Sequence, residues 1–162
     1  MSSGQITRLT KETFKRFGKY YRAKEVASGH VDDWFREMIT EEYVVERPLK
    51  FGVTCCDNQS KFSVSSMERH MSSEEVQFAC NKSIILSVAD SDPWSCPRTK
   101  DVVSFLLEPG DVVVLKKGIW HAACHAVAGK TMYYFLSYTN GDPNETKWVN
   151  IEPNSIDINL EA

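Results

Sequence analysis

The sequence lacks the surplus of lysine and arginine that a protein held to nucleic acid by phosphate contacts normally carries. Only 19 Lys and Arg stand against 22 Asp and Glu among 162 residues, so the formal net charge is −3. A nucleic-acid-binding face shows as an excess of positive residues, so we expect no nucleic-acid partner. Long apolar runs are missing too, and none approaches the ~20 residues that cross a bilayer. We therefore expect no membrane partner either.

Two further absences concern the compartment of the protein. The first residues, MSSGQITRL, contain no apolar core, which argues against a secretory signal peptide. The five cysteines are odd in number and show no CxxC spacing, so neither a zinc site nor a disulfide framework is expected from them. We interpret them as reduced thiols that pack as small apolar residues, and we expect a cytoplasmic protein.

No internal repeat or low-complexity segment interrupts the chain. Its length suits a single domain over residues 1–162, built around one core. The first part, 1–47, is predicted to be helical. In LTKETFKRFG, Thr10 is a candidate N-cap, and the apolar residues of 31–43 are spaced as on the face of a second helix.

From residue 48 to about 141 the pattern changes to short runs rich in Val, Ile, Phe and Tyr. Turn compositions such as DNQS, EPG and TNGDPN separate these runs. Strands this frequent, with no helical pattern between them, are typical of an antiparallel barrel or sandwich. We predict an all-β fold with its barrel at about 48–141, short helices before it and a polar tail at 142–162. Exposed strand edges favour a homodimer, because pairing covers them.

Alternation along FSVSSMERH predicts where two polar side chains point. Residues two apart share one face of a strand, and Phe62 with Val64 marks the buried face. Glu68 and His70 then point inward as well. An acid and a histidine in an interior are costly unless they are paired or bind something. The alternative is a different register, which would leave the two residues as a surface pair.

A second polar cluster lies in KKGIWHAACH. His121 and His125 share one parity there, and with the acid and histidine of the first run they offer the mixed nitrogen and oxygen ligands that a divalent metal accepts. One of Glu74 and Glu75, in SSEE, is a further candidate ligand. Lys117 is a candidate for binding a substrate carboxylate. The alternatives are a solvated lysine at a strand end and, for His125, a structural histidine.

Two motifs resemble those of the cupin superfamily. ERHMSSEE is similar to the first motif, H-x-H-x3,4-E, with Glu68 in the place of the first histidine and His70 as the second. GDVVVLKKGIWHAACH is similar to the second, G-x5-P-x-G-x2-H-x3-N, with His121 on the histidine, Lys116 on the proline position and His125 on the asparagine position. The resemblance implies a double-stranded β-helix, or jelly roll, and a divalent metal such as Mn, Ni, Zn or Fe. The residues on the ligand positions are Glu68, His70, Glu75 and His121.

The order of an N-terminal helix, MERH, KGIWH and the strand YYFLSY resembles the ureidoglycolate lyase family over about residues 7–141. That family cleaves ureidoglycolate to glyoxylate and urea in allantoin breakdown. Three positions depart from its usual pattern. Glu75 stands where a glutamine is usual, Ala122 where a second histidine follows, and Thr139 with Asn140 where an Asp-Arg pair closes the last barrel strand.

The resemblance implies a lyase that acts on a small carboxylate substrate. His121, His70 and Glu68 are the candidate catalytic residues. If no metal binds, an imidazole can exchange protons near neutral pH while a carboxylate orients it. Lys117 and His125 are the candidate substrate-binding residues. Two alternatives stay open: another small-molecule cupin enzyme, such as a sugar or hydroxy-acid isomerase or oxygenase, and a non-catalytic ligand-binding cupin. The departures at Ala122 and at Thr139 with Asn140 favour another small-molecule cupin enzyme.

Overall fold

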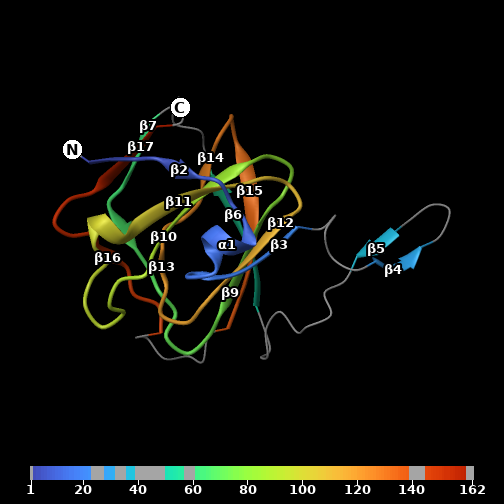
Figure 1. Ribbon diagram of the computed structural model, residues 1–162, viewed down its shortest axis with the longest axis horizontal. Coiled ribbons are helices and arrows are strands. Elements are labelled where there is room, and N and C mark those ends of the chain that lie inside the picture. Colours follow the sequence, from blue (N-terminus) through green and yellow to red (C-terminus); the bar gives the residue numbers. More distant parts are fainter. Residues whose placement is uncertain are drawn as a thin grey trace.

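The computed structural model describes residues 2–22, 28–31, 36–38, 50–56, 61–138 and 145–159 of the chain. These residues are predominantly β-strands, and most of the strands form sheets stacked around a common interior, whereas the pair formed by 28–31 and 36–38 lies apart from them (Figure 1). Within these ranges no helix has the length and apolarity that a membrane span needs. The all-β fold predicted from the short apolar runs is confirmed.

One wall of the barrel is a five-stranded antiparallel sheet in the order β3-β12-β9-β15-β6. Its strands are Gly18–Arg22 (β3), Asp111–Leu115 (β12), Glu75–Ala79 (β9), Thr131–Ser137 (β15) and Lys50–Cys56 (β6). Every second side chain of a strand points to the same side, so Glu75 and Gln77 of β9 face the interior together with Tyr133 of β15. This wall therefore contributes polar groups to the interior.

The opposite wall has the order β13-β10-β11-β2, and β14 also pairs with β10. Its strands are Trp120–His121 (β13), Ile84–Ala89 (β10), Val102–Leu107 (β11), Ile6–Thr7 (β2) and His125–Ala126 (β14), and a 3-10 turn at Thr99–Asp101 (η2) precedes β11. The whole of β10 is buried, because apolar layers cover both of its faces. Ile84 and Leu86 face the barrel interior, whereas Ile85 and Ala89 face the other side.

Further strands cover the outer side of β10. Ser2–Gly4 (β1), Ile156–Asn159 (β17) and Lys61–Val64 (β7) form a three-stranded sheet, and Val149–Asn150 (β16) pairs with Ser66–Met67 (β8). We call the apolar cluster on this side the outer core: Phe62, Val64, Met67, Ile85, Ala89, Trp120, Ala122, Ile151, Ile156 and Ile158. The barrel core lies between the two five-stranded walls: Phe14, Phe17, Tyr20, Ala79, Ile84, Leu86, Val88, Phe105, Leu107, Val113, Leu115, Ile119, Cys124 and Tyr133.

Within the described part of residues 1–47, the prediction of helices holds in one place. Lys11–Phe14 (α1) is helical and begins after Thr10, whose hydroxyl accepts a hydrogen bond from the Thr13 backbone N–H at 3.1 Å. Before and after α1 the chain forms β1, β2 and β3, which join three different sheets. The Phe14 ring packs against the Phe105 ring with centroids 5.2 Å apart, so the barrel core holds this short helix in place.

Two other predicted regions are corrected by the structure. Where it describes 31–43, the chain is extended: Ser28–Val31 (β4) pairs with Arg36–Met38 (β5), and the other positions lie outside the described residues. The expected polar tail at 142–162 contains β16 and β17, which contribute to the layer over β10. A helix of about a dozen residues is marginal without packing partners, whereas a paired strand satisfies its backbone groups.

Candidate active site

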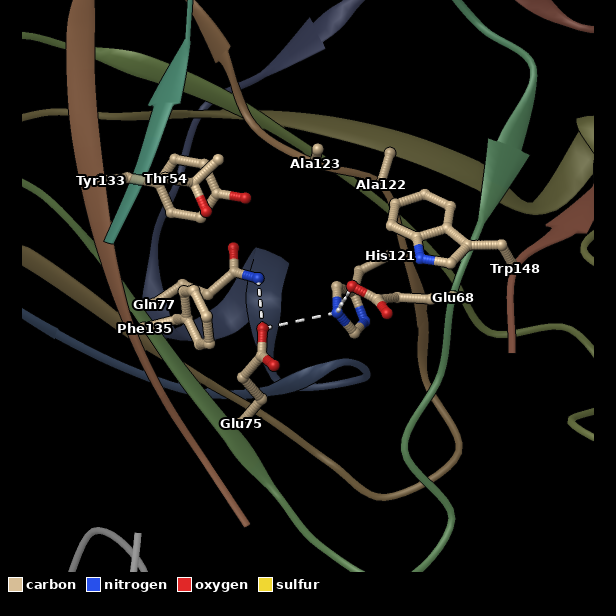
Figure 2. A pocket seen from close by; sticks show the side chains of 10 residues that line it. All are labelled: Thr54, Glu68, Glu75, Gln77, His121, Ala122, Ala123, Tyr133, Phe135 and Trp148. Carbon is tan, nitrogen blue, oxygen red and sulfur yellow. Dashed lines mark hydrogen bonds and ion pairs between the residues drawn. The ribbon is translucent and has the colours of Figure 1, made fainter. Parts of the chain in front are cut away.

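A cavity of about 200 Å³ opens between the two walls of the barrel (Figure 2). Acidic, amide and imidazole groups lie toward one side of it, and aromatic and hydroxyl groups lie around the remainder. Its lining residues are Thr54, Glu68, Glu75, Gln77, His121, Ala122, Ala123, Tyr133, Phe135 and Trp148. The cavity therefore combines groups able to exchange protons with a partly apolar wall.

A pair of backbone hydrogen bonds places Glu68 beside His121. The Glu68 N–H donates to the His121 carbonyl at 2.9 Å, and the His121 N–H donates to the Glu68 carbonyl at 2.8 Å. Residues paired in this way across antiparallel strands project their side chains to the same side. The His70 carbonyl accepts a hydrogen bond from the Gly118 N–H at 2.8 Å, which ties the turn before His121 to the same strand.

The inward direction of Glu68 and His70 was expected, but the reason given for it was wrong. Phe62 and Val64 belong to the outer core, and so does Met67. The alternation therefore breaks between Val64 and Met67, and the residues that follow Met67 change sides. Without that break, Glu68 would share the face of Phe62 and lie away from the cavity.

Glu75, from β9, lies between the two histidines. Its Oε2 is 2.8 Å from His70 Nε2, and its Oε1 is 3.4 Å from His121 Nε2. The Gln77 side chain donates a further hydrogen bond to Glu75 Oε1 at 2.6 Å. Only 5% of Glu75 is exposed, whereas Glu74 is half-buried and does not line the cavity. The structure thus places Glu75, and not Glu74, at the site.

The charges in this cluster shift one another's protonation. Burial raises the pKa of Glu75, but the attraction and hydrogen bonds of His121 and His70 outweigh burial and hold that pKa well below its ordinary range. Burial lowers the pKa of His121, and the charges of Glu75 and Glu68 reverse this, so that the net shift is upward. For Glu68, burial dominates and raises the pKa of the carboxyl.

The same cluster contains a donor set that fits a divalent metal ion. One ligand atom each from Glu68, His70 and His121 can be chosen so that all three lie within 4.8 Å of one another. His121 Nδ1 is 3.3 Å from the Ile119 carbonyl and His70 Nδ1 is 3.1 Å from Thr146 Oγ1. The two Nε2 atoms are buried, and neither makes a well-aligned hydrogen bond to the described residues. Metal-binding histidines usually anchor one ring nitrogen in this way and direct the other at the ion, and here the Nε2 atoms face the carboxylates of Glu75 and Glu68.

The four-residue ligand set implied by the resemblance is therefore represented here by three residues. Both carboxylate oxygens of Glu75 are in contact with histidines or with Gln77. Glu68, His70 and His121 alone present a mixed nitrogen and oxygen set of the kind that Zn, Mn, Fe or Ni accepts.

Two predicted substrate-binding residues lie elsewhere. Lys117 is exposed, and neither it nor His125 lines the cavity. The His125 ring stacks on the Phe62 ring, with centroids 3.7 Å apart and planes 13° apart, on the side of the outer core. His121 and His125 do not share a face, because β13 ends at His121 and an irregular segment precedes β14.

Several lining residues were not identified from the sequence. Gln77 could have been found, because it lies two residues after Glu75 on the same strand and so faces the same way. Tyr133 and Phe135 alternate in the same manner along β15. Trp148 follows the barrel strands in the expected tail, and its position at the cavity depends on distant strand pairing that no local pattern reveals.

Gly118 holds a backbone conformation that positions the His121 strand. Its φ is +78°, and a Cβ atom added there would lie 3.3 Å from Pro93 Cβ. We expect Gly118→Ala to lower the free energy of unfolding by about 1–2 kcal/mol, because an L-residue is strained in this region. Activity should fall as well, because the displaced turn carries His121.

Urea unfolding and steady-state assays would measure both effects. Gly129→Ala is the matched control, because Gly129 also has a positive φ, +59°, but lies outside the cavity lining. It should lose a similar stability and keep its activity. Equal losses of activity in the two variants would contradict a role for the Gly118 turn in positioning His121.

Comparisons with known proteins agree with this architecture. Residues 1–157 match the family model described as ureidoglycolate lyase, while no curated protein matches the chain significantly. The TDP-fucose-3,4-ketoisomerase WlaRA of Campylobacter jejuni is 12% identical, with a TM-score of 0.51 over 80% of this chain and 87% of that one. A 3,4-ketoisomerase of Helicobacter canadensis is 14% identical, with a TM-score of 0.51 over 79% and 89%. The fold is that of the cupins, as the two motifs implied.

Proposed function

The chain belongs to the ureidoglycolate lyase family, and from this premise we propose that it cleaves ureidoglycolate to glyoxylate and urea. The observation that carries the proposal is the convergence of Glu68, His70, Glu75 and His121 at one cavity between the barrel walls. A volume of about 200 Å³ is below the usual range for drug-sized ligands and suits a small substrate.

The reaction needs one proton removed and one returned. The substrate carries a hydroxyl, a carboxylate and a ureido nitrogen on one carbon. Removing the hydroxyl proton forms the aldehyde of glyoxylate as the C–N bond breaks, and the departing nitrogen takes up a proton to complete urea. A site for this chemistry requires a base near the hydroxyl and an acid near the nitrogen.

Glu68 and His121 are suited to these two roles. Glu68 Oε1 lies 3.7 Å from His121 Nε2, and both side chains line the cavity. Burial raises the pKa of Glu68, which makes it a stronger base than an ordinary carboxylate for the hydroxyl proton. The nearby carboxylates raise the pKa of His121 overall, so that its protonated ring can donate to the departing nitrogen.

The substrate carboxylate requires a positive partner. Among the residues described as lining the cavity there is no lysine or arginine. A divalent ion held by Glu68, His70 and His121 would supply this charge and lower the pKa of the substrate hydroxyl. Glu68 and His121 would then act as ligands, so their roles as base and acid belong to the metal-free site. In the absence of the ion, His121, whose pKa is raised by the neighbouring carboxylates, is the cation available in that lining.

The proposal predicts equal amounts of glyoxylate and urea from ureidoglycolate. The assay is run on protein stripped with a chelator and again after addition of Mn²⁺, Ni²⁺, Zn²⁺ or Fe²⁺. We expect turnover to require, or to rise with, one of these ions, because the described lining has no other fixed positive charge.

The His121→Ala variant, prepared in the same way, is the control for contaminating activity. No product under any metal condition would contradict the proposal. Binding of a sugar acid by the same preparation would then favour another small-molecule cupin enzyme, or a ligand-binding cupin if the bound compound is not converted.

A further inference from the structure

Behind Glu75 lies a short chain of buried hydrogen bonds that reaches away from the histidines. The Gln77 side-chain nitrogen donates to Glu75 Oε1 at 2.6 Å, and the Cys124 thiol donates to the Gln77 side-chain oxygen at 3.3 Å. Only 2% of Gln77 and 3% of Cys124 are exposed. Figure 2 shows the Gln77 amide directed at Glu75, on the side opposite Glu68.

The two ends of this chain fix the direction of the Gln77 amide. An amide presents an acceptor at one end and a donor at the other. Burial raises the pKa of Cys124 well above its ordinary value, so that the thiol keeps its proton and acts as a donor. A reversed amide would place its oxygen against the Glu75 carboxylate and its N–H groups against the S–H. The contact with the carboxylate would be repulsive and the thiol would lose its acceptor, so Glu75 and the Cys124 thiol together favour one amide direction.

The direction of the Gln77 amide determines how the Glu75 carboxylate is held between the two histidines. Glu75 Oε1 is shared between the Gln77 amide and His121, while Oε2 remains 2.8 Å from His70. Without the amide donor, Oε1 would lose its shortest contact, and the carboxylate could rotate away from one histidine. The spacing of the two imidazoles depends on this carboxylate, because it is the acidic group in contact with both.

We propose that Gln77, held in one orientation by the Cys124 thiol, is a positioning residue that keeps Glu75 between His70 and His121. The proposal rests on the proposed function for its catalytic consequence only. The structural part of the proposal is that the positions of both imidazole rings depend on Gln77. This part can be tested without turnover.

The first test follows the histidine rings in metal-free protein by long-range ¹H–¹⁵N spectra. Gln77→Met removes the amide and approximately keeps its volume. We expect the ring signals of His70 and His121 to shift, and the signals of His125 to stay, because that ring stacks on Phe62 outside the cavity. Unshifted His70 and His121 signals would overturn the proposal, and so would an equal shift of His125, which would mark a general disturbance.

A second test separates the hydrogen bond of Cys124 from its packing in the barrel core. Cys124→Ser keeps a donor and Cys124→Ala removes it, while both shorten the side chain. We expect the alanine variant to shift the His70 and His121 signals in the same direction as Gln77→Met, and the serine variant to restore them. If Gln77→Met does not fold, the two cysteine variants still test whether the hydrogen-bond chain through Gln77 positions the histidine rings. Equal spectra for the two cysteine variants would overturn the role of the thiol.

Binding and turnover give the functional readouts. Titration with Mn²⁺ alone should give a dissociation constant about tenfold higher for Gln77→Met, the usual effect of losing a group that orients metal ligands. For ureidoglycolate, kcat should fall by about tenfold with KM changed by less than about twofold, as expected if Gln77, although it lines the cavity, acts through Glu75 rather than on the substrate. If the wild-type protein cleaves no ureidoglycolate, the proposed function fails, and the ring signals still decide this inference.

Discussion

Replacing His121 by alanine is expected to lower kcat/KM for ureidoglycolate by at least about 100-fold, the lower range for loss of a general acid or base. The side chain is 2% exposed, and its Nε2 points into the cluster formed with Glu68 and Glu75. The variant removes this nitrogen whether it transfers a proton or holds a metal ion. Steady-state rates with and without added metal would measure the loss.

The fold of the His121→Ala variant should remain intact. The hydrogen bonds between residue 121 and Glu68 involve backbone atoms only, so they survive the substitution. The imidazole nevertheless helps to hold the pKa of buried Glu75 below its ordinary range, so its removal leaves that carboxylate less well compensated. Thermal unfolding should therefore stay cooperative but occur at a lower temperature than in the wild type.

His125→Ala is the matched control for this experiment. Its ring stacks on Phe62 and is half-buried on the outer-core side, away from the cavity lining. We expect activity near that of the wild type and a stability loss of about 1 kcal/mol, the usual size of an aromatic pair. Equal losses of activity in the two histidine variants would contradict the assignment of His121 to the site.

The sequence was sufficient for those parts of the fold in which local patterns decide. Short alternating runs identified the barrel strands. Glu68, His70 and His121 were grouped from the two motifs, and the structure places their ligand atoms within 4.8 Å, although the alternation used to direct Glu68 and His70 inward does not hold.

Long-range pairing decides the parts that the sequence did not reveal. Ser2 of β1 pairs with Ile156 of β17, and β2 pairs with β11, so the N-terminal strands depend on partners far along the chain. The change of side between Val64 and Met67 also has no local signal. It follows from the pairing of Met67 with Val149, in a segment that reads as a polar tail.

Glu75→Gln is expected to have the second large effect, a loss of activity of at least about 100-fold. Glutamine is the usual residue here in the family that the sequence resembles, but in this chain both histidines contact the carboxylate. The substitution keeps the shape of the side chain and removes the charge that lies 2.8 Å from His70 Nε2 and 3.4 Å from His121 Nε2. Without that charge, His121 loses the main interaction that raises its pKa, and its ring holds a proton less well at neutral pH. Glu74→Gln is the control, because Glu74 does not line the cavity, and it should keep full activity.

The same substitution predicts how stability depends on pH. Contacts with the histidines hold the pKa of Glu75 in the folded protein well below its ordinary value of 4.5. A depressed carboxyl pKa contributes stability above the unfolded pKa and loses it as the pH falls toward the folded pKa. The wild-type protein should therefore be more stable than Glu75→Gln at neutral pH, and this advantage should shrink from about pH 4.5 downward.

Urea unfolding of metal-free wild-type, Glu75→Gln and Glu74→Gln proteins at neutral pH and near pH 3 would measure this dependence. Removing one member of a buried ionic cluster typically costs several kcal/mol, and an isosteric amide that keeps some hydrogen bonds should cost less. The difference between wild type and Glu75→Gln should be large at neutral pH and clearly smaller near pH 3, while Glu74→Gln follows the wild type throughout. A difference that stayed constant with pH would mean that the charge of Glu75 is not what stabilises the cluster, and that its shape alone holds the histidines.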